Sequence, residues 1–302
     1  MNAPDRQKPR KTAADFAPRI LEIFDGYVHG HMTKREFIEK AGKYAAAGVT
    51  GAAVLAQLQP NYALAQQVAP DDPAIETMTA EYDSPDGNGL IKGLMAKPAG
   101  VAGPLPAVLV VHENRGLNPY IEDVVRRTAK AGYLAFGPDG LSPLGGYPGT
   151  DEEGREMQKS LDPAKLMADF FAAFEYLRDH DGSTGKVGAV GFCYGGGVCN
   201  ALAVAYPDLA ASVPFYGRQP AAADVAKIEA PLMIHYAGLD ERINAGWPDY
   251  EAALKAAGKS YEAFIYDGVN HGFHNDTTPR YDAAAAELAW ERTLAHFATH
   301  LA

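Results

Sequence analysis

From about Met78 onward, short apolar runs typical of strands alternate with longer runs typical of amphipathic helices. Residues 106–111 and 186–192 have the pattern of buried strands, and residues 163–180 that of a helix. Strands that alternate with helices build a mostly parallel sheet with helices on both faces. The sequence therefore predicts an α/β fold, a doubly wound sheet of about eight strands, in one domain over residues 76–302.

The same patterns place the other elements of this domain. Residues 79–82 and 90–96 flank a Ser-Pro-Asp-Gly-Asn-Gly turn and predict a hairpin. Further strands are expected at 133–136, 211–216, 231–236 and 261–266. Helices are expected at 121–131, 194–205, 245–257 and 281–301. A long loop is expected at 143–153.

Residues 1–75 have a different character and predict an N-terminal helical arm. The first dozen residues are polar, and apolar residues then recur at helical spacing between positions 13 and 58. Thr33 with Glu36 three residues later has the pattern of a capping box, which begins a helix. We expect this arm to pack on the main domain or on a second subunit, which would make a homodimer.

One segment of the arm resembles an export signal. Lys34-Arg35 precedes an Ala/Gly-rich stretch at 44–58 and an Ala-Leu-Ala sequence at 63–65, as in a twin-arginine leader with its cleavage site. The pair is Lys-Arg rather than Arg-Arg, and about thirty residues precede it. The stretch is too short and too weakly apolar for stable membrane insertion. We therefore expect a cytoplasmic protein, with a periplasmic location as the alternative.

The charge and the cysteines exclude several classes of protein. The net charge of −11 argues against nucleic acid as a partner, because binding to phosphates requires a basic surface. The two cysteines, Cys193 and Cys199, would be separated by roughly 9 Å along a helix, beyond the reach of a disulfide bond. Two free thiols fit a reducing compartment.

The stretch Gly-Phe-Cys-Tyr-Gly-Gly-Gly, residues 191–197, lies between an expected strand and an expected helix. This context is typical of a nucleophile elbow, a strained turn that exposes its central side chain above the sheet and needs glycines beside it. The helix N-terminus would lower the pKa of the Cys193 thiol, and the Tyr194 amide would face the reacting group. A phosphate-binding loop is less favoured, because the stretch has no Gly-Lys-Ser/Thr ending.

An acid and a histidine follow in the chain order that this architecture requires. Asp240 comes after the expected strand at 231–236, and His271 comes after the one at 261–266. His271 would take the thiol proton, and Asp240 would orient its ring. Glu241 remains an alternative acid and His274 an alternative base. We assign no metal, because His271 and His274 have no third ligand nearby in sequence and His29 and His31 lie on the arm.

Four motifs together resemble the dienelactone hydrolase family of the α/β-hydrolase fold: Val-His-Glu-Asn-Arg-Gly (111–116), Gly-Phe-Cys-Tyr-Gly-Gly (191–196), Gly-Leu-Asp (238–240) and Asn-His-Gly-Phe (270–273). The resemblance covers about residues 78–300 and implies a cysteine hydrolase that opens enol lactones or related esters through a thioester. It also implies that Glu113 holds the resting thiol and receives its proton. The amides of Tyr194 and Asn114 would form the oxyanion hole.

The sequence departs from the family where the substrate would bind. Relatives that act on a dienelactone carboxylate have an arginine just past the histidine, whereas here the first arginine after His271 is Arg280. Arg115 and Arg155, and also Arg218, are candidates for holding a carboxylate, although the sequence favours a surface position for each of them. A set of aromatic residues could line a pocket, although aromatic residues near strand ends usually belong to the core: Tyr120, Phe192, Tyr194, Tyr216 and Phe273.

The sequence thus predicts a hydrolase of small esters or lactones that uses Cys193, His271 and Asp240 and needs no cofactor. Two alternatives are a thiol protein that reduces peroxides and a hydrolase-shaped protein that binds a ligand without turnover. No second cysteine is placed to resolve an oxidised Cys193, which disfavours the first alternative. The complete triad disfavours the second.

Overall fold

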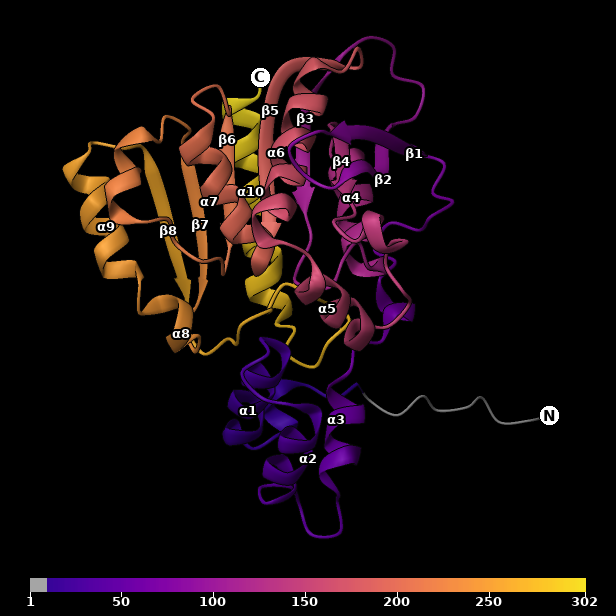
Figure 1. Ribbon diagram of the computed structural model, residues 1–302, viewed down its shortest axis with the longest axis vertical. Helices are drawn as coiled ribbons and strands as arrows, with labels where there is room; N and C mark the ends of the chain where they lie inside the picture. Colours follow the sequence, from indigo (N-terminus) through magenta and orange to yellow (C-terminus); the bar gives the residue numbers. More distant parts are fainter. Residues whose placement is uncertain (1–9) are drawn as a thin grey trace.

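The computed structural model describes residues 10–302, and its centre is an eight-stranded sheet (Figure 1). The strands lie in the order β1-β2-β4-β3-β5-β6-β7-β8. The first two are antiparallel to their neighbours, and the other six are parallel. The bounds are β1 Ile75–Ser84, β2 Gly89–Pro98, β3 Leu105–Val111, β4 Leu134–Pro138, β5 Ser183–Phe192, β6 Ala211–Phe215, β7 Leu232–Ala237 and β8 Tyr261–Tyr266. The predicted hairpin and the mostly parallel sheet of about eight strands are confirmed.

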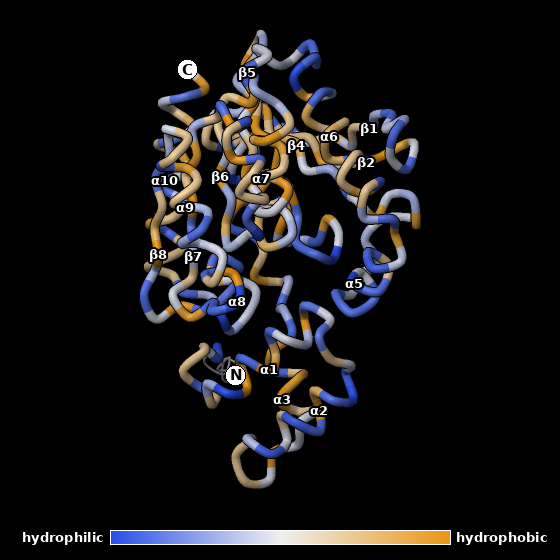
Figure 2. Tube along the Cα trace, turned by 60° about the vertical axis from the view of Figure 1, so that its left-hand side comes forward, coloured by the Kyte–Doolittle hydropathy of each residue, from blue (hydrophilic) through white to orange (hydrophobic). Residues whose placement is uncertain are grey.

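Helices cover both faces of the sheet and bury a separate apolar core on each. On one face lie α6 (Pro163–Asp179), α7 (Tyr194–Ala205) and α9 (Trp247–Ala256). On the other lie α4 (Pro119–Lys130) and α10 (Ala283–His300). Figure 2 shows the apolar residues gathered among the central strands and the helices that pack on them. The fold is therefore doubly wound, as predicted, because each sheet face presents apolar side chains to a helix layer.

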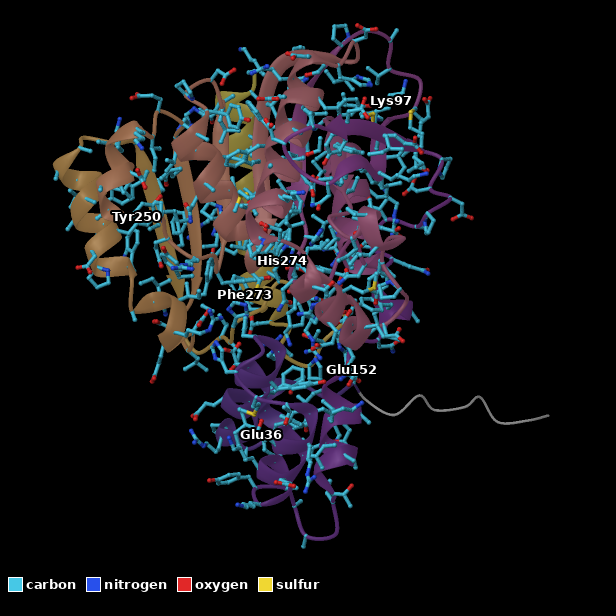
Figure 3. The ribbon with its side chains drawn as sticks, viewed as in Figure 1. Glu36, Lys97, Glu152, Tyr250, Phe273 and His274 are labelled. Carbon is cyan, nitrogen blue, oxygen red and sulfur yellow. The ribbon has the colours of Figure 1, made fainter. Side chains whose placement is uncertain are left out.

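The arm consists of three helices with an apolar core of their own: α1 (Pro18–Val28), α2 (Lys34–Gly42) and α3 (Gly51–Leu58). The predicted capping box begins α2, where Thr33 accepts a hydrogen bond from the Glu36 amide. The arm lies against the end of the main domain where the parallel strands terminate (Figure 1). Lys34 pairs there with Glu152 of the main domain at 2.6 Å. Figure 3 labels Glu152 beside the arm. The arm thus packs on its own main domain.

The region predicted as a loop at 143–153 contains part of a helix, so this prediction was wrong. Helix α5 spans Asp151–Ser160, after a short 3-10 turn at Ser142–Leu144. Its sequence is too polar to show apolar residues at helical spacing. Thr150 caps the helix, because its hydroxyl oxygen accepts a hydrogen bond from the Glu153 amide. Acidic residues in its first turn are favourable at the positive end of the helix dipole. Capping and charge, rather than an apolar stripe, define this helix.

Three further 3-10 turns lie at Ala13–Asp15, Tyr62–Leu64 and Ala222–Lys227, and the short helix α8 spans Glu241–Asn244. Across residues 10–302, no helix combines the length and apolarity needed to cross a bilayer.

Candidate active site

Cys193 occupies a strained turn between β5 and α7. Its backbone has φ 55° and ψ −109°, in the region of positive φ that residues with a side chain rarely adopt. A Cβ on Gly191 would lie 2.2 Å from the Gly195 carbonyl oxygen, and one on Gly195 would lie 2.3 Å from the Val111 carbonyl oxygen. Both glycines are therefore required by close backbone contacts. This is the geometry predicted for a nucleophile elbow.

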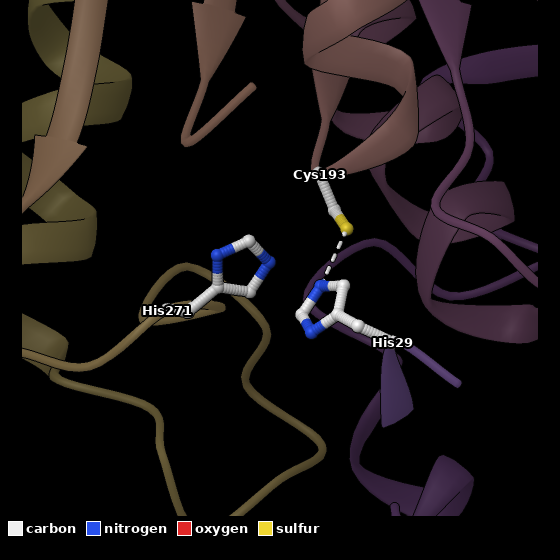
Figure 4. A group of neighbouring side chains, drawn as sticks. All are labelled: His29, Cys193 and His271. Atoms are coloured by element: carbon white, nitrogen blue, oxygen red, sulfur yellow. Dashed lines mark hydrogen bonds between the residues drawn. The ribbon is translucent and has the colours of Figure 1, made fainter. Parts of the chain in front are cut away.

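Asp240 and His271 are brought together by the loops that follow β7 and β8. Asp240 caps α8, since its Oδ1 accepts from the Ile243 amide at 3.2 Å. Its Oδ2 lies 2.5 Å from His271 Nδ1. The His271 Nε2 atom is buried without a hydrogen-bond partner among the described residues, and it lies within 4.8 Å of the Cys193 sulfur. Asp240 thus orients the His271 ring, and Figure 4 shows this ring beside the thiol of Cys193.

The two alternative residues lie elsewhere. Glu241 is exposed. His274 is buried and its Nδ1 lies 2.7 Å from the Tyr120 hydroxyl, while its ring stacks on Phe192. Burial, followed by the positive charge of Arg127 and by the proximity of His235, lowers the pKa of His274 well below its usual value. In Figure 3 His274 lies within the main domain. The hydrogen bond therefore forms between Asp240 and His271. His274 is a neutral side chain in the interior of the main domain.

A second histidine, His29 from the arm, also reaches the thiol. His29 follows the last residue of α1, and its Nε2 lies 3.3 Å from the Cys193 sulfur (Figure 4). Its ring is 4.7 Å from the His271 ring and meets it edge to face. The sequence placed His29 on the arm, which is correct, but it gave no indication that His29 contacts Cys193. Its contact with Cys193 joins residues 164 positions apart, so no local spacing indicates it.

His29 is oriented in the same way as His271, by an acidic residue on its Nδ1 side. Its Nδ1 lies 2.8 Å from the Asp25 carbonyl oxygen and 3.3 Å from the Asp25 carboxylate. Asp25 stands one helical turn before His29, and this i,i+4 pairing is the one signal in the sequence that could have drawn attention to His29. The thiol is therefore flanked by two imidazoles, each with a carboxylate behind it.

Arg242 adds a third contact to His29. Its Nη2 lies 3.0 Å from His29 Nε2. A guanidinium group only donates hydrogen bonds, so His29 Nε2 carries no proton while Arg242 holds this position. The Arg242 side chain is 35% exposed and can turn away. His29 can then take a proton at Nε2 and pair with a thiolate.

The charges around Cys193 favour the ionised thiol. Burial alone would raise the pKa of Cys193, but the charges of His271 and His29 outweigh burial and lower it to about 5. Burial likewise opposes protonation of His271, yet the Cys193 sulfur and Asp240 raise its pKa to about 10. The pKa of His29 is also raised, by Cys193 and Asp25 against the opposing effect of burial. The arrangement is that of a thiolate–imidazolium pair near neutral pH.

Glu113 and Asn114 lie close to the arm, but their predicted roles do not follow from their contacts. The buried Glu113 carboxylate accepts from Asn275 Nδ2 at 3.3 Å and lies 3.7 Å from an Arg115 nitrogen. The hydrogen-bond partner of the thiol is His29 instead. The Asn114 side chain donates to the Val28 carbonyl oxygen at 2.8 Å, which ties the loop after β3 to α1. That Glu113 holds the resting thiol stays a prediction.

The four candidate substrate-binding residues are all buried. Arg115 pairs with Asp151, and the Arg155 guanidinium lies 4.4 Å from the centre of the Tyr27 ring. A surface position for these two arginines was therefore wrong. Tyr216 packs its ring 4.8 Å from that of His271, with its hydroxyl unpaired among the described residues, and Phe273 packs on Tyr216. Of the four, Tyr216 packs directly on His271.

The thiol itself is nearly enclosed. Cys193 is 9% exposed and His271 5%. Two surface hollows of about 260 and 580 Å³ meet near His180, and neither of them is lined by Cys193 or His271. Each hollow lacks a nucleophile with a base beside it, so its size alone does not make it a site of reaction. The site that can do chemistry lies beneath the arm.

Two family models match the chain. The model of the dienelactone hydrolase family matches residues 91–301, and a model described as YqhI-like matches residues 7–46, the part of the arm that contains His29. The hydrolase fragment YghX of Escherichia coli K12 is 58% identical over 115 residues, which are 38% of this chain and 98% of that protein. A protein of Yersinia pestis, assigned by name to the carboxymethylenebutenolidases, is 32% identical over 220 residues, 68% of this chain and 82% of its own.

Solved structures agree with these relatives. A protein of Klebsiella pneumoniae described as a dienelactone hydrolase superposes with a TM-score of 0.65 at 27% identity, over 74% of this chain and 99% of its own. An esterase of Pseudomonas putida superposes over 95% of this chain with a TM-score of 0.61, but at 16% identity it shows the fold alone. The fold is the α/β-hydrolase fold, and the chain is an ester or lactone hydrolase that belongs to the dienelactone hydrolase family.

Proposed function

We propose that the protein cleaves a small lactone or carboxylic ester through a thioester on Cys193, with His271 and Asp240 completing the triad. The observation that carries this proposal is the position of the Cys193 sulfur, on a strained turn and within 4.8 Å of His271 Nε2. The hydrogen bond of His271 Nδ1 to Asp240 leaves Nε2 free to exchange protons with the thiol and the substrate.

The chemistry takes two steps. The thiolate of Cys193 attacks the carbonyl carbon, the alkoxide leaves with the proton from His271 Nε2, and a thioester remains. His271, now neutral, takes a proton from a water molecule, and the resulting hydroxide releases the acid and returns the thiolate. We place the oxyanion at the amides of Tyr194 and Asn114. Tyr194 opens α7, where backbone N–H groups have no partner within the helix.

We assign His29 a part in the same reaction, as a second partner of the thiol. With Arg242 turned away, a protonated His29 stabilises the thiolate in addition to His271 and lies close enough to donate a proton to the leaving group. In this scheme Glu113 is not needed to hold the resting thiol. The arm is thus a part of the catalytic site and not an appendage.

A trapped acyl group tests the thioester. We expect that the protein, mixed with a chromogenic acetate ester and quenched in acid, carries one acetyl group on the peptide that contains Cys193. Cys199 is the internal control, because it is fully buried and burial raises the pKa of its thiol. Mass spectrometry of the digested protein reads both positions. Acetylation of a serine, or of no residue during steady turnover, would contradict a thioester at Cys193.

The buried, neutral Cys199 also gives no support to a peroxide-reducing function, which would need a second thiol to resolve an oxidised Cys193. A homodimer through the arm stays a prediction. The acidic charge of −11 supports a partner other than nucleic acid.

We further propose that the protein acts in the cytoplasm and that the Lys34-Arg35 segment is part of the fold rather than an address. Cleavage after Ala65 would remove the whole arm and with it His29, which contacts the nucleophile. We expect the protein isolated from its own cells to begin upstream of His29. N-terminal sequencing checks this, and a mature chain that begins near residue 66 would refute it.

A further inference from the structure

Three side chains from distant parts of the chain aim metal-ligating atoms at one point. They are His29 at the end of α1, Cys193 at the elbow and His271 in the loop after β8, and their donor atoms all lie within 4.8 Å of one another. The reaction proposed above uses these atoms as acid, base and nucleophile. The same atoms are ligands for a soft or borderline divalent ion.

We propose that this trio is a binding site for Zn²⁺ and that the bound ion switches the hydrolase off. The spacing fits: Zn–S and Zn–N bonds place neighbouring ligand atoms of a tetrahedral site about 3.5 Å apart, and His29 Nε2 lies 3.3 Å from the sulfur. The His271 ring nitrogen lies within 4.8 Å of both atoms and must move closer to join them. A water molecule would take the fourth position, as at zinc sites with three protein ligands.

The surroundings of both histidines support the assignment. A zinc-binding histidine normally donates its other N–H to a carboxylate or carbonyl oxygen, which fixes the ring and directs its free nitrogen at the ion. Here His271 Nδ1 faces Asp240 at 2.5 Å, and His29 Nδ1 faces the Asp25 carbonyl oxygen at 2.8 Å and its carboxylate at 3.3 Å. Moreover, His271 Nε2 is buried with no hydrogen-bond partner among the described residues.

One group opposes the ion. Arg242 Nη2 lies 3.0 Å from His29 Nε2, so the guanidinium must leave before a cation can bind there. Its side chain is partly exposed and can do so. The ligands bind as a thiolate and two neutral imidazoles, and any protons they hold pass to solvent. Because Zn²⁺ would occupy both the sulfur and His271 Nε2, it would block attack on a carbonyl; this inhibition, unlike the binding, rests on the proposed function.

Cobalt reports on the site without any need for activity. We expect the reduced protein to bind one Co²⁺ per chain with a thiolate-to-cobalt charge-transfer band in the near ultraviolet. Zn²⁺ should displace the Co²⁺ and remove the band. Cys193→Ser should abolish the band. His29→Ala should weaken binding more than about 100-fold, since even outer-shell partners of zinc sites contribute about 10–100-fold. Arg242→Gln should tighten it.

His31→Ala is the matched control, because His31 is an exposed histidine two residues from His29. It should bind Co²⁺ as the wild type does. If His29→Ala fails to fold by circular dichroism, His29→Gln replaces it. Absence of the band in the wild type, or equal affinity in the His29 and His31 variants, would overturn the site.

Activity is measured separately, as ester hydrolysis against added Zn²⁺. Loss of hydrolysis with the same midpoint as Zn²⁺ binding supports the switch, and full hydrolysis with Zn²⁺ bound overturns it. A cobalt band in the wild type together with a Cys193→Ala variant that still hydrolyses esters would support the metal site while counting against the proposed function.

Discussion

Cys193→Ala and His271→Ala should each lower kcat/KM for a small chromogenic acetate ester by roughly 10⁴-fold or more, with little further loss in the double variant. In the proposed mechanism no thioester forms without the sulfur, and without His271 the leaving group and the attacking water have no proton carrier. Because the two side chains act on the same transition state, their effects should not add. Steady-state hydrolysis by the wild type and the three variants measures this.

The control is Cys199→Ala, which removes the other thiol from a position buried in the core and should leave the rate on folded protein close to that of the wild type. Equal rates in the wild type and Cys193→Ala would show that Cys193 is not the nucleophile. A His271→Ala variant with near-normal activity would show that another group, with His29 the nearest, serves as the base.

Most of the fold could be predicted because it follows from local pattern. Buried strands such as β3 and β5 are continuous apolar runs, and α6 has a helical period, so each is visible within its own residues. Helix α5 could not be predicted in this way. It is stabilised by the Thr150 cap and by Asp151, whose buried carboxylate pairs with Arg115. Such a pairing depends on tertiary structure, which a local pattern does not contain.

The residues of the candidate site likewise fall into those whose positions follow from the order of the strands and those whose positions depend on tertiary contacts. Cys193, Asp240 and His271 each follow a strand, and the carboxyl ends of parallel strands meet at one edge of a sheet, so their proximity could be argued from order alone. His29 has no such constraint, because the arm is not part of the sheet and its docking depends on side-chain contacts. Asn114 with the Val28 carbonyl oxygen is one of these contacts, and Arg155 with the Tyr27 ring is another.

His29→Ala should move the acidic limb of the pH profile of kcat/KM to higher pH. In the wild type the limb reflects the Cys193 pKa of about 5, where burial favours the neutral thiol and the charges of His271 and His29 outweigh it. Removing His29 takes away one hydrogen bond to the sulfur and, where Arg242 has turned away and His29 is protonated, one positive charge, so the thiol pKa rises. At a pH below the pKa of the thiol in the variant, the variant should be about tenfold slower than the wild type for each unit by which its thiol pKa has risen. The reason is that its thiolate fraction is smaller by the same factor.

The alkaline limb should respond differently, and this separates a charge effect from general damage to the site. Activity should fall at high pH as His271 loses its proton near pH 10. Burial lowers the pKa of His271, but Cys193 and Asp240 raise it by more, so the net pKa is about 10. Asp240 remains in the His29→Ala variant, so the alkaline limb should stay in place. The pH profile of kcat/KM should therefore become narrower because only its acidic limb moves. His31→Ala, which alters an exposed neighbour, should keep the wild-type profile. An unchanged acidic limb in His29→Ala would mean that the arm covers the thiol without contributing to its ionisation.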